Sequence, residues 1–437
     1  MNIKEEKIII AIIALLILSP MFAFGASEQL RAMIRSDGTL LVNDKPIFPI
    51  GARTEKIDDI KEIAKCGFNL VLGSGEWTAK HYAEAKKYNL MIMGGHYAWA
   101  HFMGTRKKIN LRARGEAVIN NVLKYATDQR NRTLVQTLKQ FDSFPRLIGW
   151  KIGDEPEAKL TEIVEAGYEI IKSYNPSHIV APIICDRQWL CNFRNACDVI
   201  MIDNYPIRGS YHKKYLTSIN ETYKRIELAA KVMKDKAVWY ISPLYPPSYW
   251  SMNPSEEMTL KDMRLVNYAG LIAGAKGIIM YHWGLLDKAW TKDEKGRKMI
   301  FVDRQIIMKR RQNIISMVAE LRKLTPIICN GRVNSEPDIR WISPGQNGPG
   351  PQIMRVFDYY GKQYVMIINL LDVPLVGRVF GPDPAHNFRA YDADVFLGSD
   401  DLKVTSVSPG EPEITVAPRG AGVFVLTRRS IIEQHQK

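Results

Sequence analysis

An apolar segment that ends in a group of carboxylates is the part of this chain best suited to chemistry. The segment Leu147–Ile152 is followed by Gly153-Asp-Glu-Pro-Glu157. A buried strand that delivers carboxylates at its C-terminal end is how a (β/α)8 barrel builds an active site. We therefore expect Glu155 to act as a general acid or base. The same residues also suit a helix start, which would make Asp154 the helix cap and put Pro156 in the first turn.

Aromatic rings, carboxylates and hydrogen-bonding groups follow the other apolar segments as well. Sugars offer apolar C–H faces to Trp and Tyr rings, and hydroxyl groups to Asp, Arg and His side chains. The recurrence of such groups predicts a carbohydrate-binding cleft, although core packing under a loop is the alternative for each single ring. The candidate substrate-binding residues are Arg53, Trp77, His96, Asp154, Tyr205, His282 and Trp283.

Hydrolysis of a glycosidic bond needs two carboxyl groups, one to protonate the leaving oxygen and one to act as a nucleophile or to activate water. Glu155 is the candidate acid. Asp203 is the first candidate for its partner, because Asp203-Asn-Tyr-Pro206 ends a strand in a rigid turn that would aim the side chain. The alternative is that Asp203 only caps this turn. The other candidate carboxylates are Glu76, Asp186 and Asp287.

Eight apolar segments of strand length would position these side chains, and segments with helical periodicity separate them. Strands that are apolar throughout and alternate with helices indicate a parallel sheet covered on its outer face. Eight such units favour a closed (β/α)8 TIM barrel, and the lack of a Gly-rich phosphate loop after the first strand argues against a dinucleotide-binding fold. The expected strands are Phe48–Gly51, Asn69–Leu72, Leu90–Met93, Leu147–Ile152, Ile179–Ile184, Val199–Ile202, Val238–Ile241 and Gly277–Met280.

The pattern changes near Thr325-Pro326, where short alternating segments separated by turn residues begin. A hairpin is expected around Tyr360-Gly361, and further short strands follow it. These features predict an antiparallel β-sandwich. We therefore expect an α/β barrel domain of residues 27–325, followed by a β-sandwich domain of residues 326–430.

Residues 1–26 resemble a secretory signal peptide. Lys4 and Lys7 precede or flank the apolar run Ile8–Leu18, and Ala23-Phe-Gly25 offers a cleavage site. The run is short for a membrane span. We therefore expect a secreted, periplasmic or cell-surface protein with no membrane span after cleavage; an uncleaved anchor is the alternative.

The formal net charge of +14 can indicate an anionic partner. However, Lys and Arg are spread along the chain in short clusters without interleaved aromatic residues, so we expect a solvated basic surface and no nucleic-acid partner. Five cysteines do not make a disulfide framework. Cys191 and Cys197 either pair in an oxidising compartment or remain free thiols. We expect no metal and no organic cofactor, because no ligand spacing typical of a metal site is present.

Three segments resemble the secreted clan A-type glycoside hydrolases. Leu41–Gly51 resembles the strand that leads into their barrel, and Gly149–Pro156 resembles their fourth strand, where an Asn-Glu-Pro motif carries the acid/base glutamate. Gly274–Trp283 is similar to their eighth strand, whose closing Trp floors the sugar subsite. The resemblance implies a barrel hydrolase with Glu155 as the acid/base residue.

The chain departs from this family at two positions. Asp154 stands where the motif has Asn, and Val238–Tyr245, the seventh strand, has no carboxylate at its end, where the family has its nucleophile. An inverting glycoside hydrolase, a displaced nucleophile or a non-catalytic carbohydrate-binding barrel of the cell surface would each explain the second departure. A metal-dependent hydrolase is disfavoured because the first strand lacks paired His residues. The sequence predicts no particular oligomeric state.

Overall fold

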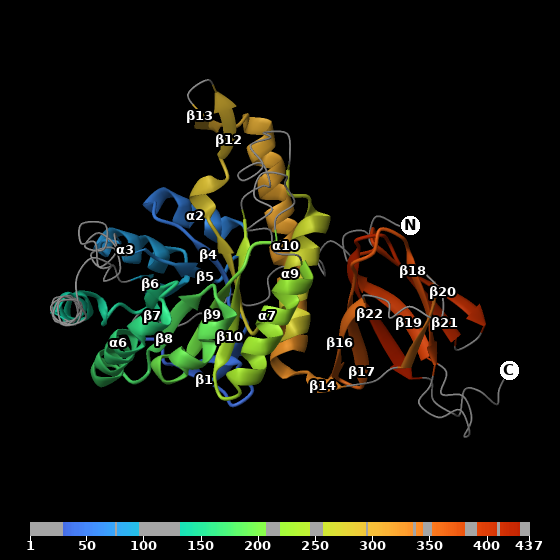
Figure 1. The fold of residues 1–437 in the computed structure, drawn as a ribbon, viewed down its shortest axis with the longest axis horizontal. Coiled ribbons are helices and arrows are strands. Elements are labelled where there is room, and N and C mark those ends of the chain that lie inside the picture. Colours follow the sequence, from blue (N-terminus) through green and yellow to red (C-terminus); the bar gives the residue numbers. More distant parts are fainter. Residues whose placement is uncertain are drawn as a thin grey trace, which may run out of the picture.

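The computed structural model of the protein describes residues 29–74, 77–95, 132–206, 219–244, 257–293, 296–334, 338–343, 352–380, 391–408 and 411–428. A mixed helix-and-strand domain lies beside a smaller domain built of strands (Figure 1). The expected signal peptide, His96 and Glu76 lie outside the described residues.

Eight parallel strands form a closed barrel, which confirms the predicted fold class. Each strand pairs with the next one along the chain, and the last pairs with the first. All eight expected strands are present, because each is an apolar run that is buried on both faces. The strands are β4 (Ile50–Arg53), β5 (Leu70–Leu72), β6 (Met91–Gly95), β7 (Leu147–Asp154), β8 (Ile179–Ile184), β9 (Val199–Asp203), β10 (Ala237–Pro243) and β11 (Ile278–Tyr281).

Helices cover the outside of the barrel. Apolar side chains such as Ile60, Trp150 and Ile226 pack between strands and helices, whereas Leu72, Met201 and others fill the barrel interior. The helices are α2 (Ile57–Lys65), α3 (Ala79–Lys87), residues 132–141, α6 (Thr161–Tyr174), α7 (Ile219–Val232) and α9 (Leu260–Ala273), with short 3-10 segments η2 (Ala158–Leu160), η3 (Arg187–Ala196) and η4 (Trp283–Leu285).

A small N-terminal sheet closes one end of the barrel. It consists of β1 (Ala32–Ile34), β2 (Leu40–Val42) and β3 (Lys45–Ile47). Leu40 and Val42 belong to the same buried cluster as the barrel interior, and the Ala32 N–H donates to the carbonyl of Ser177, just before β8. The sheet therefore covers the N-terminal ends of the strands and leaves the C-terminal ends available for a site.

Two antiparallel sheets form the β-sandwich that was expected after the barrel. One has the order β14-β16-β17-β22-β19 and the other β15-β18-β21-β20, and both contribute to one apolar core. The hairpin turns at Tyr360 and Gly361, whose positive φ angles of 47° and 71° suit a two-residue turn. The strands are β14 (Arg332–Asn334), β15 (Asp338–Ser343), β16 (Gln352–Tyr359), β17 (Lys362–Asn369), β18 (Leu375–Phe380), β19 (Tyr391–Leu397), β20 (Leu402–Ser408), β21 (Glu411–Val416) and β22 (Ala421–Arg428).

The long helix α10 (Arg304–Asn330) connects the two domains, and it differs from the expected boundary. The helix continues through Pro326, so a division after residue 325 falls inside it. Leu324, Ile327 and Ile328 around the proline are buried, and this packing outweighs the backbone hydrogen bond that proline cannot make. A hairpin of β12 (Lys288–Asp293) and β13 (Gly296–Phe301), which was not expected, precedes α10.

A buried ion network joins the barrel to the sandwich. Arg264 of α9 contacts Asp401 of the sandwich at 2.9 Å and Glu320 of α10 at 2.7 Å. The Tyr268 hydroxyl donates to Glu320 as well. Arg264 and Asp401 have side chains that are only 4% exposed. These contacts hold α9 between the two domains, where it is buried on all sides.

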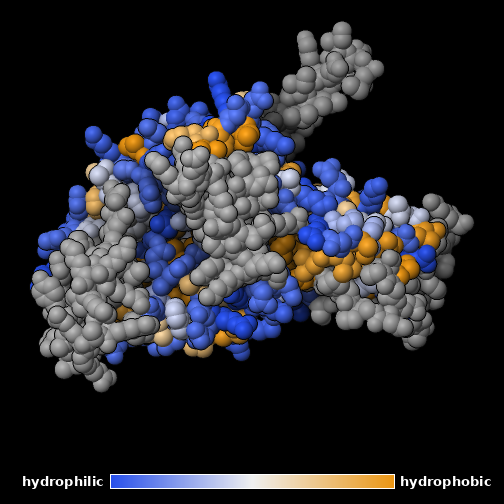
Figure 2. Space-filling view, turned by 45° about the horizontal axis from the view of Figure 1, so that its top comes forward, coloured by the Kyte–Doolittle hydropathy of each residue, from blue (hydrophilic) through white to orange (hydrophobic). Residues whose placement is uncertain are grey.

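The surface has hydrophilic and apolar regions (Figure 2), and the described cysteines are free thiols. On the face shown in Figure 2, hydrophilic residues cover much of the barrel domain, while apolar residues gather on the side of the sandwich. Cys191 and Cys197 are both free thiols, the former exposed and the latter buried. Within the described ranges, no helix is long and apolar enough to span a membrane.

Candidate active site

The C-terminal ends of four barrel strands bring most of the candidate residues to one rim. Arg53 ends β4, Asp154 ends β7 with Glu155 directly after it, and Asp203 ends β9. Tyr281 ends β11. Because parallel strands in a barrel end on the same face, residues that are up to 228 positions apart in sequence become neighbours.

Glu155 has an unusual backbone conformation. Its φ angle of 51° lies in the left-handed region, which a residue with a side chain adopts at a cost of about 1 kcal/mol or more. The Glu155 N–H donates to the carbonyl of Ile183 in β8 at 2.9 Å, and this bond holds the conformation in place. Strained residues of this kind gather at functional sites. The residue is exposed at the rim.

Asp203 is held by the turn that follows β9. The Asn204 amide donates to the Thr222 hydroxyl at 3.0 Å, and the Tyr240 hydroxyl donates to the Asn204 carbonyl at 2.8 Å. Asp203 is 9% exposed, and the Tyr205 side chain is hydrogen-bonded to its carboxyl group. These contacts fix the Asp203-Asn-Tyr-Pro segment at the C-terminal end of β9.

Glu155 and Asp203 are hydrogen-bonded to each other. Burial and the adjacent Glu155 raise the pKa of Asp203 well above its usual value. Although Glu155 is exposed at the rim, the protein atoms around its carboxyl group reduce its contact with water, and this burial and the charge of Asp154 raise the pKa of Glu155 as well. Two carboxyl groups in contact cannot both ionise easily, so the pair shares a proton under conditions in which an ordinary carboxyl group is charged. The Cys185 thiol is also hydrogen-bonded to the Glu155 carboxyl group.

Asp154 is not the helix cap that the sequence favoured. Its carboxylate contacts Lys151 Nζ at 2.8 Å and Arg53 Nη1 at 3.3 Å, whereas Glu157 precedes η2 and Leu160 precedes α6. Burial opposes its ionisation, but the two cations outweigh burial and lower the pKa of Asp154. The cap prediction was wrong because β7 extends through Asp154, which places this side chain among the cations inside the barrel mouth.

Arg53 and two tyrosines form the aromatic side of the site. The Arg53 guanidinium lies 5.1 Å from the ring centre of Tyr281, and the rings of Tyr281 and Tyr205 stack with centroids 5.7 Å apart. Both tyrosines are partly exposed. A sugar ring can stack on such a surface while its hydroxyl groups bond to the polar groups beside it.

His282 lies at the same rim as a neutral imidazole. Its Nδ1 accepts a hydrogen bond from the Gly284 N–H at 3.0 Å, and its Nε2 lies 3.5 Å from a Glu55 oxygen. Because Nδ1 accepts, Nε2 carries the hydrogen. Burial lowers the pKa of His282 to about 4, so the ring stays neutral near pH 7 and can act only as a hydrogen-bonding group.

Trp77 and Trp283 occupy positions in the core rather than on the cleft surface. Trp77 is 5% exposed, and its indole N–H donates to the Thr54 carbonyl. Trp283 is 3% exposed and packs edge-on against Phe68. Little of either ring is available to a sugar in this structure, and Tyr281 is the ring that reaches the site from the end of β11.

Three site residues were not identified from the sequence: Lys151, Tyr281 and Cys185. A lone charged residue inside an otherwise apolar strand was the signal available for Lys151, which is 6% exposed.

Of the other candidate carboxylates, Asp186 accepts a hydrogen bond from the Gln188 N–H and so serves as the cap of η3.

The end of the seventh barrel strand has no acidic residue in the described range. β10 closes with Ser242 and Pro243, and Leu244 follows. The Ser242 side chain is fully buried. Among the described residues, no group of three His, Cys, Asp or Glu side chains could hold a metal ion.

Two solved structures of glycoside hydrolases have the same fold. A glycoside hydrolase family 5 protein from Bacteroides vulgatus matches with a TM-score of 0.56 and 14% identity, over 89% of this chain and 92% of that one. A maltogenic alpha-amylase from Thermotoga neapolitana matches with a TM-score of 0.53 and 12% identity, over 87% of this chain and 99% of that one. The chain shares the fold of these proteins. No protein-family model and no curated protein matches its sequence.

Proposed function

We propose that the protein hydrolyses a glycosidic bond of an oligosaccharide or polysaccharide, with Glu155 and Asp203 as its acid/base pair. The observation that carries this proposal is the hydrogen-bonded carboxyl pair at the C-terminal rim of the barrel, with both pKa values raised. Glycosidases need one carboxyl group that remains protonated near neutral pH, and burial beside a second carboxyl group provides it. The fold shared with glycoside hydrolases supports the proposal.

The accessibility of the two carboxyl groups suggests how the roles divide. Glu155 is exposed and can reach the glycosidic oxygen of a bound substrate, so it protonates the leaving group. Asp203 is buried, and it can activate the attacking water only as a carboxylate, so the proton that the pair shares must lie on Glu155 when the substrate is bound. Carboxyl groups in glycosidases stand about 5–5.5 Å apart for a covalent intermediate and about 6.5–9.5 Å apart for direct attack by water. Substrate binding must therefore break the contact between Glu155 and Asp203.

Direct attack by water is the route that we propose. A covalent intermediate at the seventh strand would need a carboxylate there, and β10 ends in Ser242 and Pro243. The stacked rings of Tyr205 and Tyr281 would hold the sugar, with Arg53, Asp154 and His282 bonding to hydroxyl groups. The sugar contacts of His96, Trp77 and Trp283 stay predictions, as does export directed by residues 1–26.

A carbohydrate-binding barrel without catalysis is the second candidate function. The contact between the two carboxyl groups and the lack of an acidic residue at the end of β10 favour it. Both functions predict retention on a glycan, but only the hydrolase predicts product release.

Incubating the purified protein with a panel of plant, algal and bacterial glycans separates the two functions. Binding would be measured by isothermal titration calorimetry, and product release by chromatography of the soluble sugars. Products that the wild type releases and the Asp203→Asn variant does not release support the hydrolase. Binding without products supports the second function, and neither binding nor products on any glycan contradicts both.

A further inference from the structure

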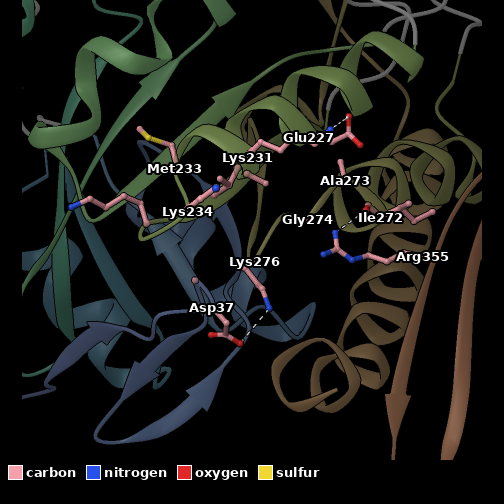
Figure 3. A pocket seen from close by; sticks show the side chains of 14 residues that line it. Asp37, Glu227, Lys231, Met233, Lys234, Ile272, Ala273, Gly274, Lys276 and Arg355 are labelled. Carbon is pink, nitrogen blue, oxygen red and sulfur yellow. Dashed lines mark hydrogen bonds and ion pairs between the residues drawn. The ribbon is translucent and has the colours of Figure 1, made fainter. Parts of the chain in front are cut away.

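A cavity lies where the two domains meet, at the end of the barrel opposite the candidate active site. Its volume is about 350 Å³, which falls within the range of small-molecule binding pockets. The lining comes from the β1–β2 turn, the end of α7, the segment between α9 and β11, and β16 of the sandwich (Figure 3). Neither the proposed hydrolysis nor the sugar-binding rim uses this cavity.

Positive charge dominates the lining. Five cationic side chains face two acidic ones; they are Lys231, Lys234, Lys236, Lys276 and Arg355, with Asp37 and Glu227. A concave surface lined mainly by one sign of charge concentrates ions of the opposite sign. Cations near a helix C-terminus also favour the helix dipole, which accounts for Lys231 in α7 and contributes at Arg355, whose guanidinium donates to the Ile272 carbonyl at the end of α9.

The two acidic groups are already engaged by other partners. Arg35, which does not line the cavity, binds Asp37 with two hydrogen bonds of 2.9 and 2.7 Å. Lys276 reaches the same carboxylate only at 3.7 Å. Glu227 contacts Lys231 at 3.1 Å and accepts a hydrogen bond from Tyr223 at 2.8 Å. Asp37 also acts on Lys276, and Glu227 on Arg355. Five cations nevertheless outnumber two carboxylates, so the lining keeps an excess of positive charge.

Arg355 lies against the end of α9 with donor capacity to spare. Its Nη1 donates to the Ile272 carbonyl at 2.8 Å, its Nε is buried without a hydrogen-bond partner, and no carboxylate lies within ion-pair distance among the described residues. Gly274 permits this approach: its φ is 112°, and a Cβ there would lie 3.1 Å from Arg355 Nη1. Burial and the nearby Arg355 lower the pKa of Lys276 in spite of Asp37, as expected where positive charges crowd together.

We propose that this cavity is a binding site for a small oxyanion of the phosphate or sulfate type, either free or as an ester on a saccharide, held by Lys276 and Arg355. Arg offers several N–H donors in a plane and Lys a point charge, and both bind such oxygens through charge-assisted hydrogen bonds. Lys234 and Lys236 add to the attraction from the cavity edge.

Isothermal titration calorimetry on the full chain tests the site, with inorganic phosphate, inorganic sulfate, glucose 6-sulfate and glucose as probes. We expect a dissociation constant of about 1 mM or tighter for at least one anion, and no binding of glucose at the same site. Lys276→Gln and Arg355→Gln should each weaken anion binding about tenfold or more. Lys80→Gln, at an exposed lysine of α3, should leave it unchanged.

The outcomes separate the source of the anion and decide the proposal. Equal binding of free sulfate and its glucose ester points to a free ion, and tighter binding of the ester points to a modified saccharide. Absence of anion binding overturns the proposal, as does binding that Lys276→Gln and Arg355→Gln weaken no more than Lys80→Gln does. Thermal melting of each variant verifies that a loss of binding does not come from unfolding.

Discussion

The carboxyl groups of Glu155 and Asp203 hydrogen-bond across the barrel mouth, although they follow different strands, β7 and β9. Burial is the largest cause of the raised pKa of both groups, and each also responds to a neighbouring carboxylate. The pair therefore keeps a proton at a pH at which separate, solvated carboxyl groups lose theirs.

This coupling predicts a pH-dependent gain in stability for Asp203→Asn. A carboxyl group with a raised folded-state pKa contributes stability that is fully present below its unfolded pKa and is lost as pH rises through its folded pKa. The amide cannot ionise, yet it can donate to Glu155 and accept from Tyr205. The variant should gain stability relative to the wild type as pH rises above about 4, by at most about 1.4 kcal/mol per pH unit.

Urea unfolding at a series of pH values from 4 to 9 measures this difference. Asp400→Asn, at an exposed carboxylate of the sandwich, is the matched control and should show no trend. A constant difference between Asp203→Asn and the wild type across this range would mean that Asp203 titrates normally.

Replacing Tyr281 by alanine should mainly weaken sugar binding, whereas replacing Trp283 by alanine should mainly lower stability. Tyr281 stacks on Tyr205 in the site, so Tyr281→Ala should weaken sugar binding about 2- to 10-fold, the equivalent of a lost aromatic contact. Trp283 is packed in the core, so Trp283→Ala should lower the free energy of unfolding by about 3–5 kcal/mol.

Glycan titrations and chemical unfolding of both variants provide the comparison. If Trp283→Ala abolished sugar binding while keeping full stability, the tryptophan would be the subsite floor that the family resemblance implied, and our placement of it in the core would be wrong.

Removing one partner of the ion network between the domains should lower the free energy of unfolding strongly. Arg264→Met leaves Asp401 and Glu320 buried with fewer partners, which typically costs about 3–5 kcal/mol. Arg311→Met removes a pair with Glu62 whose side chains are 41% and 31% exposed, so about 1 kcal/mol or less is expected. Urea unfolding curves measure both, and similar losses for the two variants would show that burial of the network is unimportant.

Much of the architecture follows from the sequence because buried parallel strands are continuous apolar runs. The ends of the strands are harder to predict, and they decide the roles of individual residues. Tyr281 is the last residue of β11 and faces the site, whereas Trp283 begins η4 and turns into the core. In a continuous strand, residues 281 and 283 would point to the same face, so their different orientations arise because β11 ends at Tyr281 and η4 begins at Trp283.

The direct contact within the carboxyl pair could not be predicted. The sequence placed Glu155 and Asp203 on the same rim, but Glu155 has a left-handed backbone, a conformation that no local pattern indicates for a glutamate. In the sandwich, β14, β15 and β18 were not expected. The Gly/Pro-rich sequence from Gly345 to Pro351 follows β15 closely and obscures the alternation that would mark this strand.

The turnover number of Glu155→Gln on a cleaved glycan tests the central claim most directly, with Glu157→Gln as the control for a nearby carboxylate outside the pair. General acid catalysis contributes about 100- to 10,000-fold. We therefore predict a loss of this size for Glu155→Gln, with unchanged sugar binding, and wild-type turnover for Glu157→Gln. Wild-type turnover by Glu155→Gln would contradict the assignment of Glu155 as the acid.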